Sequence, residues 1–502
     1  MSYDTRDFIE DLKKAGELVE INDEVDWNYE ISAFEVMSAR VGGPAILFNN
    51  IKGNKEGKVL VGHFAGTFRK PHRRIAVALG MDPNTDFLDF VQGFNKRAEN
   101  YLKPVEVASG QCKEVVKMGK EVNLLEWPFT YHAIGDAGRY IFSNSSIVKD
   151  PDSDWTNVGC YSIEVYSKNR LVITPYPHSN WVQIYTTKYE MRNESMPIAI
   201  ALGGDPAFLL CAGIMAPPGV SESDLAGGLR GKPMEFIKAE TSDLLVPANA
   251  EMIIEGEVRP YERLPEGPKI EAFGFSVGPR QPRYAIRVHC ITHRKNPILP
   301  DVHCTPAGST DCWQKCCMGQ GHSMIQRRMG MPISHNFRMH AISGGHMQAF
   351  ALKDGPEPYK GFKQDMFELA WGIPAFSSPT AHIWTDADVD LTDYEEIVEV
   401  IHTKTNPAKD WILLPAAHMQ HVLPSSWMEE EDRSRYFTAA SMRAPKLIID
   451  ATTKEEPPLG IKRTRFETLY PEELQKWVVD NWQRLGFSEE TVWKKKGKEA
   501  SF

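Results

Sequence analysis

Two glutamates, Glu266 and Glu271, flank a Gly267-Pro268 corner in the stretch RLPEGPKIEAFGF, residues 263–275. Proline fixes φ and glycine allows a tight bend, so this turn holds both carboxylates with little freedom. Two acids that share a cleft can split their pKa values, so that one stays ionised while the other keeps a proton to donate. On composition alone, a solvated loop with incidental acids is the commoner interpretation.

A second set of polar residues is scattered along the chain: Asn157 in DWTNVG, His178 in TPYPHSN and Glu222 in PPGVSES. These oxygen and nitrogen donors suit Mn²⁺ or Mg²⁺ bridging a phosphate better than thiophilic zinc. No short spacing links the three positions, so their spacing alone does not separate a metal site from three unrelated polar residues.

Cysteine and histidine are dense in HCTPAGSTDCWQKCCMGQGH, residues 303–322. Such a segment could bind Zn²⁺ or an iron–sulfur cluster. Its C-x₃-C-C spacing matches no standard ligand pattern, which favours a free, polarisable lining of an apolar pocket. The residues concerned are His303, Cys304, Cys312, Cys316, Cys317 and His322. The chain has no strand–GxGxxG–helix unit and no Walker loop, which weakens a dehydrogenase or kinase interpretation.

The first hundred residues show mixed helix and strand patterns. A helix is predicted over 5–15, with Phe8, Ile9 and Leu12 on one face and Gly16 ending it. Strands are predicted at ELVEI, PAILFNN and KVLVGHF. From about 110 to 310, alternating stretches such as TNVGCYSIEVYSKNRLVITPY, AEMIIEGEVRPYE and RYAIRVHCITHRKNPIL, with turns at DPDSD and SKNR, predict an antiparallel barrel or sandwich.

After residue 320 the α/β pattern returns. TAHIWTDADVDLTDYEEIVEVIHTK predicts a strand leading into a helix capped by Thr392 and Glu395, and PKLIIDAT predicts a buried strand. YPEELQKWVVDNWQRLGF predicts a helix with Pro471 in its first turn and Gly486 at its end. Its apolar residues would dock on another surface, such as a neighbouring subunit: Leu474, Trp477, Val478 and Trp482.

Composition sets limits on function. A chain of 502 residues suggests two or three domains, and 57 basic against 67 acidic residues, a net charge of −10, argue against general nucleic-acid binding. The N-terminus lacks an apolar h-region, and no stretch is apolar for long enough to cross a membrane. Eight cysteines, including the adjacent pair Cys316-Cys317, do not suggest a disulfide framework. We therefore expect a cytoplasmic protein.

Together these stretches resemble the UbiD family of reversible decarboxylases, which use prenylated FMN. The resemblance runs from EINDEVDW and ILFNNIKG, through LGGDPAFLLCAG and GVSESDLAGGLRGKPMEFIKAETSDLLVPANAEMIIEGEV, to PEGPKIEAFGF and the closing YPEELQKWVVDNWQRLGF. The run VPANAEMIIEGE is the most specific. The first and last segments look most like aromatic-acid decarboxylases and phenylphosphate-carboxylase-type members.

The resemblance implies an α/β (α+β) fold in three domains. Residues 1–108 would form an N-terminal α/β domain, and 109–318 a central antiparallel split β-barrel of flavin-reductase type that binds the cofactor. Residues 319–502 would form a C-terminal α/β domain with a terminal helix that helps build a homodimer or higher homo-oligomer.

The resemblance also gives the scattered residues roles. Asn157, His178 and Glu222 fall where the family holds Mn²⁺ (or Mg²⁺) against the cofactor phosphate. A K⁺ ion beside it would be held by backbone carbonyls around Val158, Cys211, Ala212 and Ile214. Glu271 would donate the proton after CO₂ leaves, with Glu266 as its polar neighbour. A flavin prenyltransferase would supply the cofactor.

Two departures from the family pattern bear on substrate and direction. Counting along NVGCYS from Asn157 puts Ser162 where the family places an arginine between its glutamates, and strand parity does not establish that Arg170 replaces it. The stretch AWGIPAFSSPTAHIW also lacks a lysine that usually reaches the cofactor.

The predicted function is reversible decarboxylation of an aromatic or α,β-unsaturated carboxylic acid. Because this arginine is missing, the sequence favours as substrate an aromatic acyl-CoA, or an arene that is carboxylated in the reverse direction. The alternatives are a plain-FMN flavoprotein reductase, a non-catalytic subunit of a multi-subunit carboxylase, and a zinc or iron–sulfur enzyme centred on Cys312 and Cys316.

Overall fold

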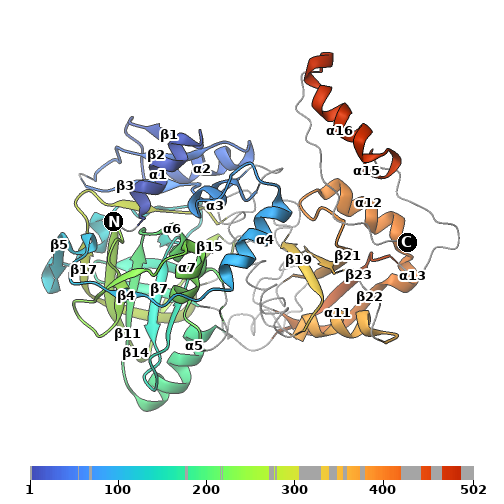
Figure 1. The fold of residues 1–502 in the computed structure, drawn as a ribbon. Helices are drawn as coiled ribbons and strands as arrows, with labels where there is room; N and C mark the ends of the chain where they lie inside the picture. Colours follow the sequence, from blue (N-terminus) through green and yellow to red (C-terminus); the bar gives the residue numbers. More distant parts are fainter. Residues whose placement is uncertain are drawn as a thin grey trace.

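The computed structural model describes residues 3–54, 56–66, 71–175, 179–214, 216, 219–270, 276–277, 280–304, 330–338, 347–353, 359–372, 379–419, 442–453 and 466–487. Within these residues the strands form a four-, a nine- and a five-stranded sheet, with a three- and a two-stranded sheet beside them. Figure 1 shows the first two large sheets in one body and the five-stranded sheet in a second, with helix α4 between them. In the described residues, no helix is both long and apolar enough to cross a bilayer.

The four-stranded sheet follows the first helix, which forms where its apolar spacing predicts. Phe8, Ile9 and Leu12 are buried on one face of this helix, and Gly16 follows it with φ +70°. The sheet order is β1-β2-β3-β18, so a strand near residue 300 joins three strands from the first 61 residues. The elements are α1 Thr5–Lys14, β1 Leu18–Ile21, α2 Glu30–Arg40, β2 Ala45–Phe48, β3 Lys58–Val61, α3 Arg73–Ala78, α4 Phe87–Ala98 and β18 Ile298–Pro300.

The nine-stranded sheet is antiparallel and curls into a half barrel. Its order is β6-β9-β10-β17-β14-β11-β7-β8, with β5 paired to β17. The predicted hairpins β7–β8 and β9–β10 are present, and MPIAIAL forms the inner strand β11. The strands are β5 Val115–Met118, β6 Arg139–Ile141, β7 Ser145–Lys149, β8 Thr156–Gly159, β9 Ser162–Ser167, β10 Arg170–Thr174, β11 Met196–Leu202, β14 Met252–Glu266 and β17 Gln281–His293.

Shorter elements surround this sheet. The three-stranded sheet has the order β13-β12-β4, and β15 pairs with β16. These elements are β4 Val105–Glu106, α5 Asn180–Ile184, α6 Pro206–Ala212, α7 Glu222–Arg230, β12 Glu235–Lys238, β13 Leu245–Pro247, β15 Lys269–Ile270 and β16 Ser276–Val277. Single helical turns are η1 Gln111–Lys113, η2 Gly119–Glu121, η3 Leu124–Glu126, η4 Tyr185–Tyr189 and η5 Glu190–Arg192.

The five-stranded sheet lies in the second body and has the order β19-β20-β21-β23-β22. Strands β20, β21 and β23 are parallel, and the two edge strands run antiparallel to them. Phe87 of α4 packs edge-on against Phe337 of β19, with ring centroids 5.5 Å apart. The elements are β19 Ile333–Arg338, β20 Met347–Leu352, α11 Phe362–Gly372, β21 Ala381–Asp386, α12 Tyr394–Lys404, α13 Pro407–Asp410, β22 Trp411–Met419, β23 Met442–Asp450, α15 Phe466–Leu469, α16 Glu472–Asn481 and η9 Gln483–Leu485.

Two predicted helix boundaries need correction. Asp393, not Thr392, caps α12: its carboxylate accepts the backbone N–H groups of Glu395 and Glu396, while the Thr392 hydroxyl donates to Asp390. Aspartate accepts both bonds more readily than a threonine hydroxyl accepts one. Pro471 is the N-cap of α16 rather than part of its first turn, and the helix ends at Asn481, before the single turn that reaches Gly486.

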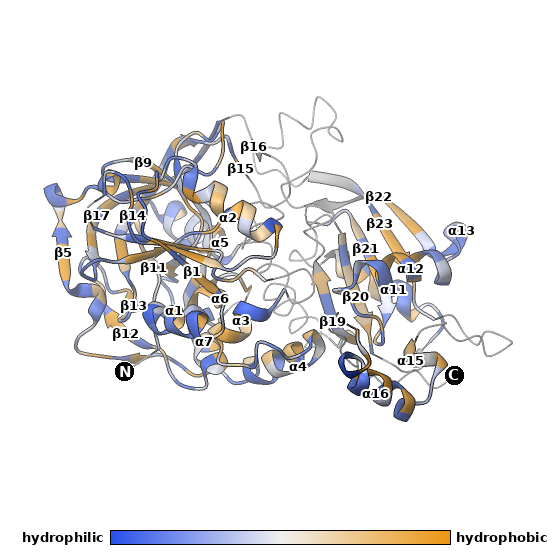
Figure 2. Cartoon of the chain, turned by 90° about the horizontal axis from the view of Figure 1, so that it is seen from above, coloured by the Kyte–Doolittle hydropathy of each residue, from blue (hydrophilic) through white to orange (hydrophobic). Residues whose placement is uncertain are grey.

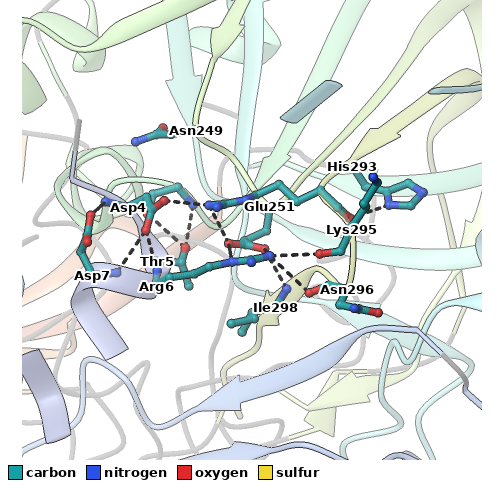
Figure 3. Close-up of polar contacts among 12 residues, drawn as sticks. Asp4, Thr5, Arg6, Asp7, Asn249, Glu251, His293, Lys295, Asn296 and Ile298 are labelled. Carbon is teal, nitrogen blue, oxygen red and sulfur yellow. Dashed lines mark hydrogen bonds and ion pairs between the residues drawn. The ribbon is translucent and has the colours of Figure 1, made fainter. Parts of the chain in front are cut away.

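The strands carry the apolar residues, as Figure 2 shows for the central and C-terminal sheets. A buried ion cluster then fastens the first helix to the central sheet (Figure 3). The Glu251 carboxylate accepts from the Arg6 guanidinium at 3.1 Å, from Arg294 at 3.2 Å and from the backbone N–H of Ile298 at 3.0 Å. Arg294 also donates to Asp4 at 2.7 Å. One carboxylate therefore holds together the chain start, the entry to β14 and the segment before β18.

Candidate active site

Glu266 ends β14 at the start of the predicted tight turn. Gly267 adopts φ +81°, and the Gly267–Pro268 peptide bond is cis. The loop before β6 holds this turn, because the N–H of Ile270 donates to Asp136 Oδ1 at 2.9 Å and Pro268 O accepts a backbone N–H at 2.8 Å. Glu266 is buried. The corner predicted from the sequence therefore carries this carboxylate inside the protein rather than in a solvated loop.

Tyr140 of β6 joins Glu266 to a second buried glutamate, Glu164 of β9. The Tyr140 hydroxyl lies 3.1 Å from Glu266 Oε1 and 3.3 Å from Glu164 Oε2. Tyr140 and Glu164 are opposite each other in the antiparallel β6–β9 pair, so their side chains share one face of the sheet. Burial, and then the two carboxylates, raise the pKa of Tyr140, which keeps its phenol neutral.

Glu164 is held by neighbours on three sides. Arg280 donates to its Oε1 at 2.8 Å, and the N–H of Gly267 donates to its Oε2 at 3.2 Å. Gly138 makes room for it, since a Cβ at that position would lie 3.1 Å from both Cγ and Oε1 of Glu164. Burial raises the pKa of Glu164, while the Gly267 amide and the Arg280 guanidinium oppose that rise.

Ser162, where the family arginine was expected, supplies no cation. It lies two residues before Glu164 on β9, so both side chains project from the same face of the strand. Arg170 does not replace the missing arginine, because its guanidinium pairs with Glu262 at 2.7 Å. This face carries an acid, Glu164, whose cation is Arg280, 116 positions away in the sequence. A further cation, Lys269, is buried in the turn itself.

Asn157 and Glu222, two of the predicted metal ligands, lie close together. Asn157 is on β8 and Glu222 opens α7, and the N–H of Val158 donates to Glu222 Oε2 at 2.8 Å. Burial raises the pKa of Glu222 to about 8, and in the described chain no basic side chain pairs with it. The buried Asn157 amide lies beside the Tyr161 hydroxyl, yet its Nδ2 makes no hydrogen bond of normal geometry. The Glu222 carboxylate, without a cationic partner among the described residues, fits a hard divalent cation, to which Asn157 would offer Oδ1 rather than Nδ2.

The carbonyls predicted for K⁺ lie at the C-terminal end of α6, next to β8. The Ala212 carbonyl accepts from Cys160 N at 3.0 Å, and the Cys211 carbonyl accepts from Ile214 N at 2.9 Å. The Ala212 carbonyl oxygen keeps a second lone pair, and the end of a helix carries partial negative charge. These backbone groups therefore fit a monovalent cation, and side-chain identity matters little there.

Several predicted residues lie outside the described part of the chain, namely Glu271, His178, Cys312, Cys316, Cys317 and His322. Of the cysteine-rich segment, His303 and Cys304 are described and buried, and the His303 ring contacts the backbone carbonyl of His132 at 3.0 Å. Among the described residues, no three His, Cys, Asp or Glu side chains gather closely enough to hold a metal ion.

Sequence reasoning missed Tyr140, Glu164, Arg280 and Asp136. Glu164 could have been found by strand alternation, since it is the next residue after Ser162 on the same face. The other three depend on which strands pair and on how the 133–138 loop folds. No short-range pattern contains that information.

Three family models match this chain, all of 3-octaprenyl-4-hydroxybenzoate carboxy-lyase, or UbiD. Its N-terminal domain matches residues 9–93, its Rift-related domain residues 103–307 and its C-terminal domain residues 321–451. The chain belongs to the UbiD family. This confirms the predicted family, and with it the class of enzyme, a carboxy-lyase.

Relatives of this UbiD-family chain match it from end to end. It is 27% identical to pyrrole-2-carboxylic acid decarboxylase of Pseudomonas aeruginosa, over 97% of this chain and 99% of the relative. Among solved structures, it is similar to vanillic acid decarboxylase of Sedimentibacter hydroxybenzoicus, with a TM-score of 0.81 and 26% identity over 97% and 100% of the two chains. HmfF from Pelotomaculum thermopropionicum, solved with FMN, gives a TM-score of 0.77 and 26% identity over 94% and 98%.

Proposed function

We propose that this carboxy-lyase reversibly decarboxylates an aromatic or α,β-unsaturated carboxylic acid with prenylated FMN as cofactor. The observation that carries the proposal is the buried Glu266 carboxyl, hydrogen-bonded to Tyr140 on a turn that two backbone contacts hold in place. It occurs in a UbiD-family chain whose relatives act on pyrrole-2-carboxylic and vanillic acids.

In this proposal, the chain's own residues orient the substrate and manage one proton. Glu271 donates the proton to the carbon that loses CO₂, and Glu266 is its polar neighbour. A well-placed general acid contributes about 10²–10⁴-fold to the rate. In the carboxylating direction the same residues take the proton from the arene carbon before CO₂ adds.

The bound cofactor supplies the electron sink that decarboxylation of such an acid needs. HmfF, with its bound FMN, supports a flavin in this fold. We assign the ions that would hold the flavin phosphate to two sets of groups. The Mn²⁺ (or Mg²⁺) ligands are Asn157, His178 and Glu222, and the K⁺ ligands are the backbone carbonyls of Val158, Cys211, Ala212 and Ile214.

Charge near the turn bears on the substrate. Glu164 and Glu266 bring two carboxyl groups close together, and the Arg280 cation is directed at Glu164. A free carboxylate substrate therefore depends on a cation other than Arg280. An aromatic acyl-CoA, or an arene carboxylated in reverse, does not place a free carboxylate on the arene before reaction.

The test is to co-express the chain with a flavin prenyltransferase, extract the cofactor for mass spectrometry, and assay the purified protein. Carboxylic acids and aromatic acyl-CoA thioesters are assayed for CO₂ release, and arenes for incorporation of ¹³C-bicarbonate. Prenylated FMN with turnover of one such substrate supports the proposal. Unmodified FMN together with NAD(P)H oxidation would instead identify a plain flavin reductase.

Two other outcomes address the remaining alternatives. Weak cofactor binding and no turnover by the isolated chain, with activity restored by partner subunits, would identify a non-catalytic subunit of a larger carboxylase. Metal analysis that finds zinc or iron in place of manganese and potassium would indicate that the reaction takes place at the cysteine-rich segment.

We also propose four more detailed features of this protein. They are the split-barrel character of the central sheet, the domain division 1–108, 109–318 and 319–502, a homodimer or higher homo-oligomer, and a cytoplasmic location. The exposed apolar residues Leu474 and Trp477 of α16 support the oligomer.

A further inference from the structure

Four side chains form a continuous hydrogen-bonded chain from the candidate active site to the protein surface. Glu266 contacts the Tyr140 hydroxyl, the hydroxyl contacts Glu164, and Glu164 pairs with Arg280, at 3.1, 3.3 and 2.8 Å. Tyr140, Glu164 and Glu266 are each no more than 4% exposed, whereas the Arg280 side chain is 44% exposed. The chain therefore begins at a buried carboxyl and ends at solvent.

The number of protons in this chain is limited by the tyrosine. A phenol has one hydrogen, so the Tyr140 hydroxyl can donate to Glu164 or to Glu266 but not to both. The remaining contact is favourable only if that carboxyl group donates its own proton to the Tyr140 oxygen. Two ionised carboxylates around one hydroxyl would place a carboxylate oxygen against a lone pair without a proton between them.

The other donors decide which carboxyl group carries the proton. Glu164 receives the Arg280 guanidinium and the Gly267 N–H, which both favour its ionised form. Among described residues, Tyr140 is the hydrogen-bond partner found for Glu266. The order that satisfies every contact is Glu266 donating to Tyr140, Tyr140 donating to Glu164, and Glu164 accepting from Arg280.

We propose that Tyr140, Glu164 and Arg280 are positioning residues that keep a proton on Glu266 and replace that proton from solvent. The proposal rests on the proposed function, in which Glu266 lies in the active site. Glu164, with its distant cation Arg280, thus takes the role that the resemblance assigns to an arginine at position 162.

The proton that Glu266 gives up is replaced by transfers along the same hydrogen-bonded side chains. Glu266 releases one proton towards the active site, and Tyr140 passes its hydroxyl proton to the Glu266 carboxylate. Tyr140 takes a proton from Glu164, which has gained one from water beside Arg280. One proton enters and one leaves, so Tyr140 ends as a neutral phenol and Glu164 as a carboxylate. Arg280 supplies charge and no proton.

Asp136 faces Tyr140 of this cluster from a neighbouring segment, and a second charged residue, Lys269, is buried next to the turn. Asp136, in the loop before β6, accepts from the N–H groups of Ala133 and Ile270, and burial raises its pKa. Lys269 is buried on β15. Both are unchanged in the variants below, so differences among these variants report on Tyr140, Glu164 and Glu266.

The first test needs no turnover. Infrared spectra of the cofactor-free protein at pH 7, in H₂O and D₂O, detect the C=O stretch of protonated buried carboxyl groups. In wild type minus Glu266→Gln difference spectra we expect one such band, because bands of other carboxyl groups cancel. Glu164→Gln should abolish this band, since Tyr140 then donates to an ionised Glu266. Tyr140→Phe should shift or remove it.

The control for this test is Glu262→Gln, which removes a carboxylate that Arg170 and Arg287 bind on the same sheet, away from the cluster. It should retain the band. Circular dichroism establishes that each variant is folded, and Glu164→Asp offers a conservative rescue. A wild-type protein without the band, or a Glu164→Gln protein that keeps it, would overturn the proposal.

The second test uses the enzyme loaded with prenylated FMN. Glu164→Gln should lower kcat about 10–100-fold with KM changed less than about twofold, and the alkaline limb of the pH profile should move to lower pH. An unchanged pH profile would contradict the relay. If the loaded enzyme turns over no substrate, the proposed function is rejected, and the infrared band still tests the proton transfer through Tyr140 and Glu164. If the enzyme is active but lacks the band, only this proton transfer is rejected.

Discussion

At the scale of single residues, Glu222 stands out as a buried acid at the start of α7. It is 2% exposed and accepts backbone N–H groups, that of Val158 among them, but no basic side chain in the described chain balances its charge. Burying an unpaired carboxylate is costly, and a bound cation removes that cost. Its place at the start of α7, beside Asn157, is where we propose that an ion holds the flavin phosphate.

The first prediction concerns this ligand. Glu222→Gln should weaken Mn²⁺ binding by the cofactor-free protein at least about 100-fold, because it removes the charged donor while keeping the shape of the side chain. Calorimetric titration with Mn²⁺ measures the loss, and absorbance of the co-expressed protein measures retained flavin. Asp224→Asn, in the same helical turn, is the matched control and should bind as wild type does. Equal Mn²⁺ affinity in both variants would reject Glu222 as a ligand.

The sequence could predict the candidate site only in part at this scale. The Glu266 turn could be predicted, because proline and glycine act on their own backbone within a few residues. The pairing of Glu164 with Arg280 could not, because it spans 116 positions and depends on the folding of β9, the turn and the segment before β17 together. That a serine, Ser162, stands where the resemblance implies an arginine could be read from the sequence, but the nearby pair of Glu164 and Arg280 could not.

At the scale of elements, the Glu251 cluster holds three segments together. Its carboxylate is fully buried and satisfied by Arg6, Arg294 and a backbone N–H. A buried carboxylate stabilises the fold only when all of its donors are present, since the loss of one partner leaves another charge uncompensated. The position of α1 on the central sheet therefore depends on one side chain.

We predict that Glu251→Gln lowers the free energy of unfolding by about 3–5 kcal/mol, since Arg6 and Arg294 lose the charge they share. Guanidinium unfolding followed by intrinsic fluorescence gives the change in midpoint. The control is Glu257→Gln on β14, whose partly exposed pair with Arg259 should contribute about 0–1 kcal/mol. Comparable losses in the two variants would show that burial of the cluster does not matter.

A second link between elements predicts a pH dependence. His132, before β6, contacts Asp301, after β18, at 3.0 Å. Burial lowers the pKa of His132, but Asp301, with Asp136 and Glu35, outweighs burial and raises it above its usual 6.5. The folded-state pKa exceeds the unfolded one, so this pair stabilises the fold fully below pH 6.5, and its contribution is lost as pH rises through the folded-state pKa.

Asp301→Asn should therefore cost a few kcal/mol of unfolding free energy at pH 5.5, and this cost should decrease as the pH is raised from 5.5 through the folded-state pKa of His132. Urea unfolding curves for wild type and variant across this range provide the measurement. Asp154→Asn, an exposed carboxylate beside Lys149, should change little at any pH. A cost that stays constant over the whole pH range in which both proteins fold would contradict the ion pair.

The presence of helices and strands could be predicted from the sequence better than the residues at which they begin and end. The amphipathic helix α1 and the alternating hairpins form as expected, because the pattern and the burial agree over many residues. The cap of α12 was misplaced by one residue, since Thr392 and Asp393 are both capping residues and tertiary contacts decide between them.

At the scale of the whole molecule, α16 stands apart from the rest. Both views place it outside the C-terminal sheet (Figures 1 and 2). Its Leu474 is 44% and its Trp477 54% exposed. Side chains of this type and exposure on one helix are typical of an interface, and the proposed occupant is a second copy of the chain.

Trp477→Glu should therefore reduce the mass of the assembly towards that of the 56.7 kDa chain, because large aromatic residues dominate interface energies and removal of one weakens association roughly 30-fold or more. Size-exclusion chromatography with light scattering over a range of concentrations measures this. Glu473→Gln, an exposed neighbour on the same helix, should leave the mass unchanged. Identical masses for wild type and Trp477→Glu would exclude α16 from the interface.

Strand β18 has a consequence for the order in which the chain is made. Its partner β3 ends at Val61, but β18 begins only at Ile298. At about 5–20 residues per second, β3 emerges from the ribosome roughly 12–47 s before the strand that covers its edge. An uncovered edge is a template for pairing with another chain. Neighbouring ribosomes on one message would bring such edges together, so slower initiation should raise the yield of folded protein more than slower elongation.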